Sequence, residues 1–294
     1  MSSELQVNTI TEATSGSGIT FAKDVIPATP LSHRNMVING AMQVAQRGTS
    51  TTGLGADGSS YNTCDRWDTN FLNTAGRLTM SQVSDVHDGF SKALKLECTT
   101  ADTSIAAGEL FQLMYGFEGQ DLQQLKKGTS DAEKFTISFY VKGNANATYQ
   151  LEFKDSDNSR VNAQTFAVTT SWNRITLTFV ADTTGAFAND NGSSLRIFFW
   201  LMAGTTYTGG GTPPSTWAAF TANKRATGQV NVFDSTSNDF FITGIQLEVG
   251  SVATDFEHKS FAVEKRLCMR YFQKYVNIGA TGFVPDNGSR SYAH

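Results

Sequence analysis

The sequence predicts an all-β fold, an antiparallel jelly-roll sandwich with an extended N-terminal attachment segment and a C-terminal amphipathic helix. The first observation behind this prediction is the alternation of apolar and polar residues in short runs, which places one set of side chains on a buried face. The second is the presence of Gly- and Asn-rich turn sequences between those runs. The third is composition, because 39% hydrophobic residues and 21 phenylalanines among 294 residues exclude intrinsic disorder.

Five runs show the alternation, at residues 94–98, 135–141, 149–153, 175–179 and 245–249. In these runs we expect the polar residues, Gln150 and Glu152 among them, to face water. Residues 195–201 (LRIFFWL) are apolar on both faces after Arg196. We therefore expect them to form a central strand or one covered on both sides. Turn sequences separate the runs, at residues 143–146, 155–158, 189–192 and 209–214.

The chain divides into three parts: residues 1–35, a sandwich over 36–258, and 259–294. The first part is rich in Ser, Thr and Gly and predicts short extended pieces that cannot bury themselves. Such pieces either stay flexible or pack on copies of themselves or on a partner. The candidate attachment or trimer-forming residues of this part are its isolated apolar positions, Leu5, Val7, Ile10, Ile19 and Phe21.

The third part begins with a predicted helix over 260–275, with Ser260 as its N-cap. Apolar residues recur there at helical spacing and predict a single buried stripe. The stripe consists of Val263, Leu267, Cys268, Tyr271, Phe272 and Tyr275. We expect it to pack either on the sandwich or on symmetry mates. A shorter helix is expected at Asp121–Lys127 (DLQQLKK).

Charge and targeting signals restrict the partners. The 23 Lys and Arg against 27 Asp and Glu give a net charge of −4, which disfavours general nucleic-acid binding. No secretory signal follows Met1, and the longest apolar run, 197–203, is too short to cross a bilayer. We therefore expect a soluble protein made in a cytoplasm. Cys64, Cys98 and Cys268 are too few and too widely spaced for a disulfide framework and are expected to be buried thiols.

The sequence contains no phosphate-binding loop, HExxH or GxSxG motif, so no catalytic residue, metal or cofactor is assigned. Asp65 and Asp68 flank Trp67 and could form the carboxylate pair of a glycosidase, but a strand with a buried Trp and solvated or Arg-paired acids is the favoured interpretation. Asp155, Asp157 and Asn158 could form a calcium loop, but a polar turn is favoured, because the glycine and distal glutamate of an EF-hand are missing.

Three aromatic residues are candidates for stacking on sugar rings. Trp217 and Tyr207 flank the Gly- and Pro-rich sequence at 209–214, and Trp67 lies between two acids. For each of them, packing in the core or in an interface is the alternative.

Several sequence blocks, in this order, resemble tail-fibre and tail-associated proteins of bacteriophages, especially those of marine and cyanobacterial hosts. The resemblance covers most of residues 1–275, and its specificity lies in the order of the blocks. The blocks are 4–11 (ELQVNTIT), 35–48 (NMVINGAMQVAQRG), 61–67 (YNTCDRW), 135–142 (FTISFYVK), 171–179 (SWNRITLTF), 242–250 (ITGIQLEVG) and 254–271 (TDFEHKSFAVEKRLCMRY).

The resemblance implies a jelly-roll domain similar to carbohydrate-binding modules, carried on a trimeric appendage of the virion. It also implies an N-terminal segment that attaches to other tail or baseplate proteins and a role in host attachment without catalysis. Three hypotheses follow: a homotrimeric structural and adhesion protein, which we favour; a module that binds host surface glycan; and, least favoured, a polysaccharide depolymerase that uses Asp65 or Asp68. The first two are compatible with each other.

Overall fold

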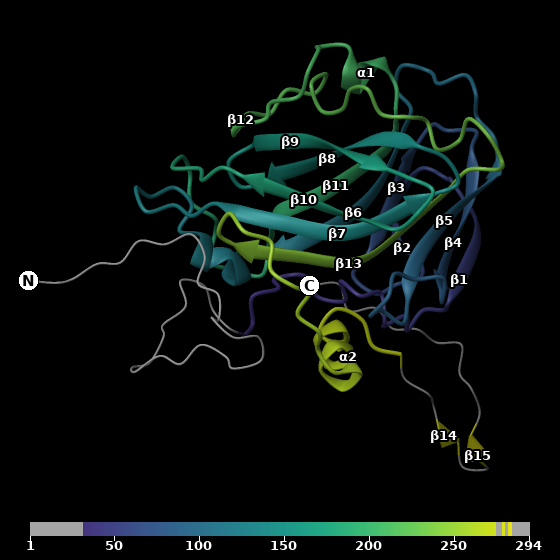
Figure 1. The fold of residues 1–294 in the computed structure, drawn as a ribbon, viewed down its shortest axis with the longest axis horizontal. Coiled ribbons are helices and arrows are strands. Elements are labelled where there is room, and N and C mark those ends of the chain that lie inside the picture. Colours follow the sequence, from purple (N-terminus) through teal and green to yellow (C-terminus); the bar gives the residue numbers. More distant parts are fainter. Residues whose placement is uncertain (1–31, 275–277, 280–281, 284–294) are drawn as a thin grey trace, which may run out of the picture.

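The computed structural model describes residues 32–274, 278–279 and 282–283, and it contains two antiparallel sheets packed face to face (Figure 1). The all-β sandwich predicted from the sequence is confirmed. The six-stranded sheet has the order β1-β4-β5-β13-β7-β10, with bounds Ser50–Leu54, Arg77–Val83, Ala93–Thr100, Asp239–Val249, Phe135–Gly143 and Asn173–Phe179. The seven-stranded sheet has the order β12-β9-β8-β11-β6-β3-β2, with bounds Ala218–Ala219, Arg160–Val168, Ala147–Asp155, Ser193–Ala203, Leu110–Glu118, Asp68–Leu72 and Gly58–Tyr61. A further short pair joins β14 (Ile278–Gly279) and β15 (Gly282–Phe283).

Strand β11 occupies the middle of the seven-stranded sheet, between β8 and β6. Its residues Ile197, Phe199 and Leu201 belong to the core between the sheets. Phe198 and Trp200 point the other way and belong to a separate buried cluster. The expectation that 195–201 forms a central strand covered on both sides is therefore confirmed.

The core between the sheets is rich in phenylalanine, which accounts for the high count of this residue. Its rings make mainly edge-to-face and tilted contacts, such as Phe139 with Phe199 at 5.3 Å between centroids. Such offset arrangements are the ones that the ring quadrupole favours. Phe135, Phe153 and Phe179 form one such group where β7, β8 and β10 come together.

The segment before β1, residues 34–47, crosses one end of the sandwich as a strap. The backbone N–H of Met36 donates to the Leu247 carbonyl, and that of Ile245 donates to the Gly40 carbonyl. A Cβ at Gly40 would lie 2.0 Å from the Ile245 oxygen, so only glycine fits at this crossing. Asn39 fixes the strap in place, because its amide nitrogen donates to the Val44 carbonyl within the strap and to the Asp65 carbonyl outside it.

Helix α2 (Phe261–Met269) follows the sandwich, and Ser260 is its N-cap as predicted, accepting a hydrogen bond from the Val263 N–H. The helix packs on the sandwich of its own chain through the strap. The predicted stripe is partly wrong. Val263 is 39% exposed, and the buried residues on the helix are Glu264 and Cys268. Glu264 is buried because it accepts a hydrogen bond of 2.7 Å from the Asn39 N–H.

The helix is also shorter than predicted, because it ends at Met269 and the chain turns there. Beyond it, Phe272 is buried and Tyr271 is half-buried against the Arg66 guanidinium, which lies 3.5 Å from the ring centroid. Leu267 is half-buried. Tyr275 and the predicted attachment residues lie outside the described residues: Leu5, Val7, Ile10, Ile19 and Phe21.

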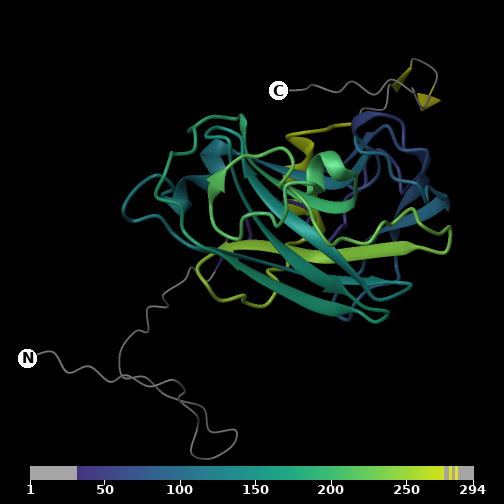
Figure 2. The same cartoon turned by 90° about the horizontal axis from the view of Figure 1, so that it is seen from above.

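The remaining helical elements are short. The predicted helix at 121–127 is a 3-10 helix, η1 (Gly119–Leu125), and α1 (Thr205–Thr208) begins the long loop that joins β11 to β13. Figure 1 shows α1 and its flanking loop on the side of the sandwich away from β13, and Figure 2 views the molecule from that side. In the part of the chain that the structure describes, no helix is long and apolar enough to span a membrane. Cys64, Cys98 and Cys268 are free and buried, as expected.

Candidate functional site

The candidate site lies on the outer face of the seven-stranded sheet, the side turned away from the six-stranded sheet. The strand register determines which residues lie side by side at its centre. Trp200 of β11 lies directly opposite Gln150 of β8 on one side and Gln112 of β6 on the other. Because side chains alternate along strands, all three point to this outer face. An indole between two amides is therefore placed at the middle of the sheet by the pairing itself.

Glu152 holds the loop between β11 and β13 against this face. It is fully buried next to Phe198, and one of its carboxylate oxygens accepts a hydrogen bond of 2.7 Å from the Trp200 indole N–H. The guanidinium of Arg225, which comes from the loop, donates to both oxygens at 3.1 and 3.2 Å. Burial raises the pKa of Glu152, and the interactions with Arg225 and Trp200 oppose that rise.

The loop covers the apolar part of the face with aromatic and cationic side chains. The Arg225 guanidinium lies about equally far from three rings, 4.8 Å from Trp200, 5.0 Å from Phe198 and 5.2 Å from Phe220. The ring of Tyr207 lies 5.4 Å from that of Trp200 and is half-buried. Tyr207, like the half-buried Phe220, therefore combines a fixed position with access to solvent.

Two amides beside Trp200 have unused hydrogen-bonding groups. Gln112 is 1% exposed, and its Nε2 has no partner, although its Oε1 accepts a bond of 2.9 Å from Asn70. Gln150 is 2% exposed, and its Oε1 has no partner. The Oε1 of Gln229, in the same loop as Tyr207, is also unpartnered. A buried polar atom without a hydrogen bond costs about 1–3 kcal/mol, so such atoms need an explanation.

The loop leaves the part of the face over β3 and β2 more open. Tyr61 is exposed there, and Asp68 and Asn70 are half-buried. Desolvation raises the pKa of Asp68 to about 6, and Arg196 and Arg66 oppose the rise. Near neutral pH this rim therefore combines an aromatic ring, an amide, a largely ionised carboxylate and the exposed Arg196.

The acids proposed for a depolymerase do not act together in this structure. Asp65 is buried, and both of its oxygens accept hydrogen bonds from Gln46, from the backbone N–H at 3.0 Å and the side-chain amide at 2.5 Å. Arg47 lies 3.7 Å from the same carboxylate. Asp68 belongs instead to the outer face. The favoured interpretation is right about the buried Trp67 and the Arg-paired Asp65, but both residues lie in the turn before β3 and not in a strand.

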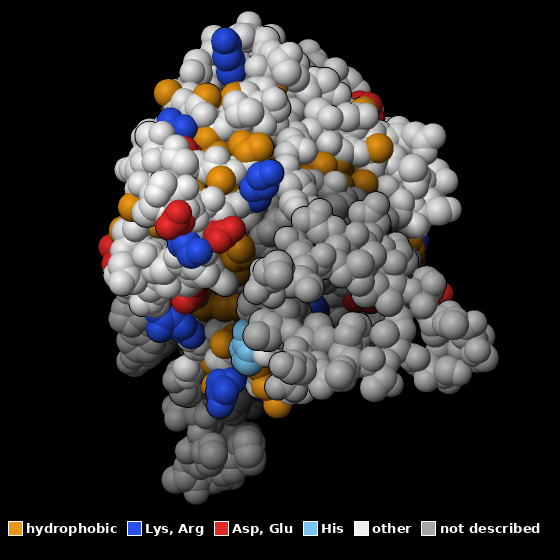
Figure 3. Space-filling model, turned by 60° about the vertical axis from the view of Figure 1, so that its left-hand side comes forward, with side chains coloured by type: hydrophobic (Ala, Val, Ile, Leu, Met, Phe, Trp, Pro, Cys, Tyr) orange, Lys and Arg blue, Asp and Glu red, His pale blue; other side chains and the backbone are white. Residues whose placement is uncertain are grey.

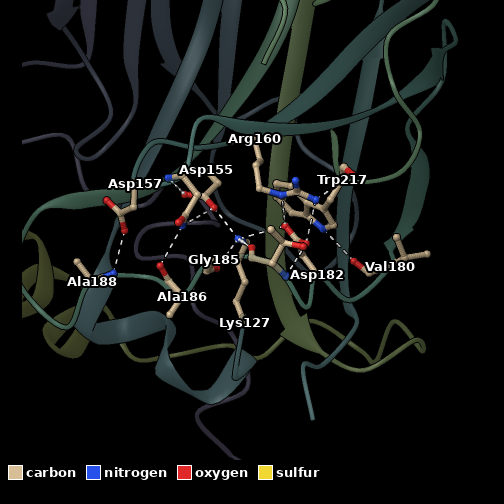
Figure 4. Close-up of polar contacts among 12 residues, drawn as sticks. Lys127, Asp155, Asp157, Arg160, Val180, Asp182, Gly185, Ala186, Ala188 and Trp217 are labelled. Carbon is tan, nitrogen blue, oxygen red and sulfur yellow. Dashed lines mark hydrogen bonds and ion pairs between the residues drawn. The ribbon is translucent and has the colours of Figure 1, made fainter. Parts of the chain in front are cut away.

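A second buried charged cluster lies at the end of the sandwich where β8 and η1 end (Figure 4). The Lys127 ammonium contacts four oxygens there: Asp155 at 2.6 Å, Asp182 at 3.1 Å, and the carbonyls of Thr184 and Gly185 at 2.8 and 2.7 Å. We call this the Lys127 cage. A lysine thus supplies the positive charge that an oxygen-rich loop needs, and the calcium-loop alternative for Asp155 gives way to a polar turn with an internal cation.

Every charged group of the cage has partners. Asp155 also accepts two hydrogen bonds from Asn158, and Arg160 donates to both oxygens of Asp182, at 2.7 and 3.1 Å. Burial alone would raise the pKa of Asp182, but the hydrogen bonds from Arg160, Thr184 and Lys127 hold that pKa below its ordinary value. The cage therefore has no oxygen free for an external ligand and acts as a structural clamp.

The surface around this end of the molecule carries acidic and basic side chains next to one another, with apolar side chains between them (Figure 3). Within the described residues, no group of three or more His, Cys, Asp or Glu side chains could hold a metal ion. Neither observation points to a ligand at this end of the sandwich.

The three predicted sugar-stacking residues have different environments. Trp67 is 0% exposed, and its indole N–H donates to the Asn39 carbonyl, so its prediction as a sugar-stacking residue is wrong. Trp217 is 9% exposed, because its ring lies over Lys127 and its N–H donates to the Val180 carbonyl. It covers the Lys127 cage rather than presenting a ring face to solvent. Tyr207 stays a candidate.

A second aromatic group reaches the surface on the six-stranded sheet. Phe90 packs against Tyr140, Phe256 and His258 at 5.1–5.4 Å between centroids, and His87 lies 4.1 Å from Tyr140. These rings mainly contact one another. Because they lack the pair of unpartnered amides found beside Trp200, they provide a control surface for the candidate site.

Sequence reasoning missed the central polar residues of the outer face. Gln150 and Glu152 were expected to face water, and they do point away from the core, but the loop containing Arg225 covers them. The signal that could have found them is the long connection from β11 to β13, because about 35 residues that form just the short α1 and the two-residue β12 are unusually many. Lys127 was missed because its partners come from loops distant in the sequence.

Comparisons with known proteins give weak similarities. No protein-family profile matches the chain, and no curated protein matches it. Among solved structures, a CBM4 module superposes with a TM-score of 0.35 at 13% identity, over 72% of this chain and 97% of that one. TmCBM61 in complex with β-1,4-galactotriose gives 0.35 at 11%, over 74% and 99%. The enzymatically active domain of bacteriophage CBA120 tailspike protein 4 gives 0.35 at 13%, over 73% of this chain and 21% of that one. The fold assignment therefore depends on the strands of this chain itself.

Proposed function

We propose that this protein is a non-catalytic component of a phage tail appendage whose sandwich binds host surface polysaccharide through the outer face of the seven-stranded sheet. The ordered sequence blocks that resemble tail-fibre proteins support the tail assignment. The outer face supports the binding role. This proposal joins the first two hypotheses and places the protein in the virion after synthesis in the host cytoplasm.

The observation behind the binding role is the pair of unpartnered amides on either side of Trp200. Sugar hydroxyls both donate and accept hydrogen bonds, so a sugar residue that displaces the covering loop would satisfy the free Nε2 of Gln112 and the free Oε1 of Gln150, both of which are buried in the free protein. The apolar face of a pyranose ring packs on an aromatic side chain, and Tyr207 supplies such a ring above Trp200. In the free protein these two buried atoms lack hydrogen bonds, and the glycan would supply them.

We propose a non-catalytic protein because, among the described residues, the outer face lacks a pair of carboxylates free to act on a glycosidic bond. Glycoside hydrolysis uses two carboxylates flanking the scissile bond. Glu152 is saturated by Arg225 and Trp200, and Asp65 by Gln46. Asp68 alone then offers an uncommitted carboxylate. Release of reducing sugar during long incubation with a bound polysaccharide would contradict this part.

Affinity gel electrophoresis tests the binding role. The protein is run through gels that contain neutral polysaccharides (dextran, galactan, xylan) or acidic ones (alginate, polygalacturonate, hyaluronate, dextran sulfate). We expect at least one to retard it, and Tyr207→Ala to weaken that binding about tenfold, which corresponds to about 1.4 kcal/mol. Tyr140→Ala is the matched control, because it removes a half-buried tyrosine from the other sheet. Equal effects of the two substitutions would contradict the assignment to the outer face.

The tail assignment is tested separately by the assembly state. We propose that residues 1–35 attach the protein to other tail or baseplate proteins and that the chain forms a homotrimer. Light scattering on the purified full chain should give a mass of three times 31.9 kDa. A stable monomer would contradict the trimer without affecting the glycan-binding role.

A further inference from the structure

Two cations face each other on neighbouring strands of the outer face. Arg196 of β11 and Lys154 of β8 are directly paired in the register. Arg196 is exposed and Lys154 is half-buried, so both are accessible to a ligand. Like charges directly opposite each other on a sheet destabilise it. The presence of this destabilising pair of cations at the edge of the candidate site therefore calls for a functional explanation.

Neither cation forms an ion pair with the rest of the described chain. Arg196 donates one hydrogen bond, to the Ser193 hydroxyl at 3.1 Å, and Lys154 lies over the Phe220 ring at 4.5 Å. The nearby carboxylate of Glu152 is already held by Arg225.

The charge balance at this edge is therefore positive, although the whole chain is acidic. Lys154, Arg196 and Arg225 face the single buried carboxylate of Glu152. Burial and the charges of Arg225 and Arg196 lower the pKa of Lys154, and the charge of Glu152 opposes that decrease. Asp68 is the other acid whose charge reaches Arg196. It lies on the opposite side of β11, on β3 beyond β6.

We propose that the polysaccharide bound at the outer face is acidic and that Arg196 and Lys154 bind its anionic groups, carboxylate or sulfate. This inference depends on the proposed glycan-binding function and names its ligand class. An anion between the two side chains removes their repulsion and adds two charge-assisted hydrogen bonds, and the planar guanidinium of Arg196 can hold either group with two parallel bonds. The sugar ring carrying the anion then extends over Phe198 toward Tyr207 and the free amides.

The test is the same affinity gel with a double variant, Lys154→Gln with Arg196→Gln. Lys265→Gln with Arg266→Gln is the control, because it removes the same charge from exposed positions on α2. We expect alginate, polygalacturonate, hyaluronate or dextran sulfate to retard the wild type at least about tenfold more strongly than dextran, galactan or xylan. The double variant should lose that preference, whereas the control should keep it. Carboxylated and sulfated polymers compared side by side identify the anionic group.

Three results would overturn the inference. If neutral polysaccharides are bound as tightly and the double variant binds them unchanged, the glycan-binding role survives and the acidic ligand class is wrong. If duplex DNA in the gel retards the wild type as strongly as the best polysaccharide, the cations form a general polyanion site. If no polysaccharide retards the protein, the proposed function fails and the inference fails with it. Circular dichroism and thermal unfolding of both double variants confirm that each is folded.

Discussion

The seven-stranded sheet contains two buried pairs of carboxylate and cation that differ in how completely they are satisfied. In the Lys127 cage, every oxygen of Asp155 and Asp182 has a partner, and Trp217 covers the cluster. Around Glu152, both carboxylate oxygens are bonded, but Arg225 Nη2 and the neighbouring amides of Gln112 and Gln150 each leave a buried polar atom without a hydrogen bond. A fully satisfied buried network stabilises a fold, and an incomplete one marks a place where a ligand can supply the missing bonds.

The largest expected effect comes from removing the cation of the cage. Lys127→Met leaves two buried carboxylates without their shared ammonium, and breaking a buried pair in this way costs about 3–5 kcal/mol of unfolding free energy. Urea denaturation of the full chain measures this loss. Folded Lys127→Met protein should bind glycan as strongly as the wild type.

Lys126→Met is the control for that substitution. Lys126 pairs with Glu133 at 3.0 Å, but both side chains are exposed, so this change should cost less than about 1 kcal/mol. If the two substitutions lowered the free energy of unfolding equally, the Lys127 cage would not be a structural clamp. The contrast between the cage and the Glu152 region would then not hold.

A substitution beside Trp200 is expected to raise the free energy of unfolding instead of lowering it. Gln150→Met keeps the length of the side chain and removes an unpartnered buried oxygen, so the free protein should become more stable by about 1 kcal/mol. Binding to the retarding polysaccharide should weaken at the same time. Urea denaturation and affinity electrophoresis on the same preparation measure both changes.

Gln164→Met provides the matched control for Gln150→Met. Gln164 on β9 is half-buried and donates to the Thr178 carbonyl at 2.8 Å, so its replacement should destabilise the protein by about 1 kcal/mol and leave binding unaltered. A destabilised Gln150→Met variant with normal binding would show that Gln150 is an ordinary structural residue.

The smallest expected effect concerns Asp68 at the rim of the outer face. Its pKa is about 6 in the folded protein, above the ordinary aspartate value of 3.8, so the folded state holds this proton more tightly than the unfolded state. The contribution of Asp68 to stability therefore falls as pH rises from about 4 to about 6 and stays low above that range. The groups acting on Asp68 are Arg196 and Arg66, which lower its pKa, and Tyr61, whose own pKa is raised by Asp68.

Asp68→Asn should remove this dependence. At pH 7 we expect the variant to be more stable than the wild type by about 1 kcal/mol, a value reduced for partial exposure to solvent, and at pH 4 the difference should vanish. Thermal unfolding across that range measures the difference between the two proteins, in which the other titrating groups cancel. A constant difference from pH 4 to pH 7 would show that Asp68 titrates normally.

The fold was largely predictable because local patterns specify it. Alternation identified the buried faces of β5, β7, β8, β10 and β13, and the apolar run with Trp200 identified the central strand. The end of α2 was not predictable, since its apolar spacing continues to Tyr275 while the tertiary contacts of Glu264 and Phe272 determine which face is buried and where the helix stops.

The candidate site was less predictable, because it depends on register and on one long loop. Nothing local to Trp200 indicates that Gln112 and Gln150 lie on either side of it, and nothing local to Arg225 indicates a bond to Glu152. Trp67 was misassigned for the same reason, since its acidic neighbours suggested a cleft and its burial follows from the strap at Asn39. Tyr207 was identified correctly as a loop aromatic with access to solvent.

Hydrogen exchange with and without the polysaccharide that retards the protein tests the central claim most directly. We predict slower exchange of backbone amides in residues 204–229, the loop with Tyr207 and Arg225 over the outer face, and unchanged exchange in residues 84–92 and 251–258 around Phe90 and His258. Protection of residues 84–92 and 251–258, with no change in residues 204–229, would place the ligand on the six-stranded sheet and contradict the account.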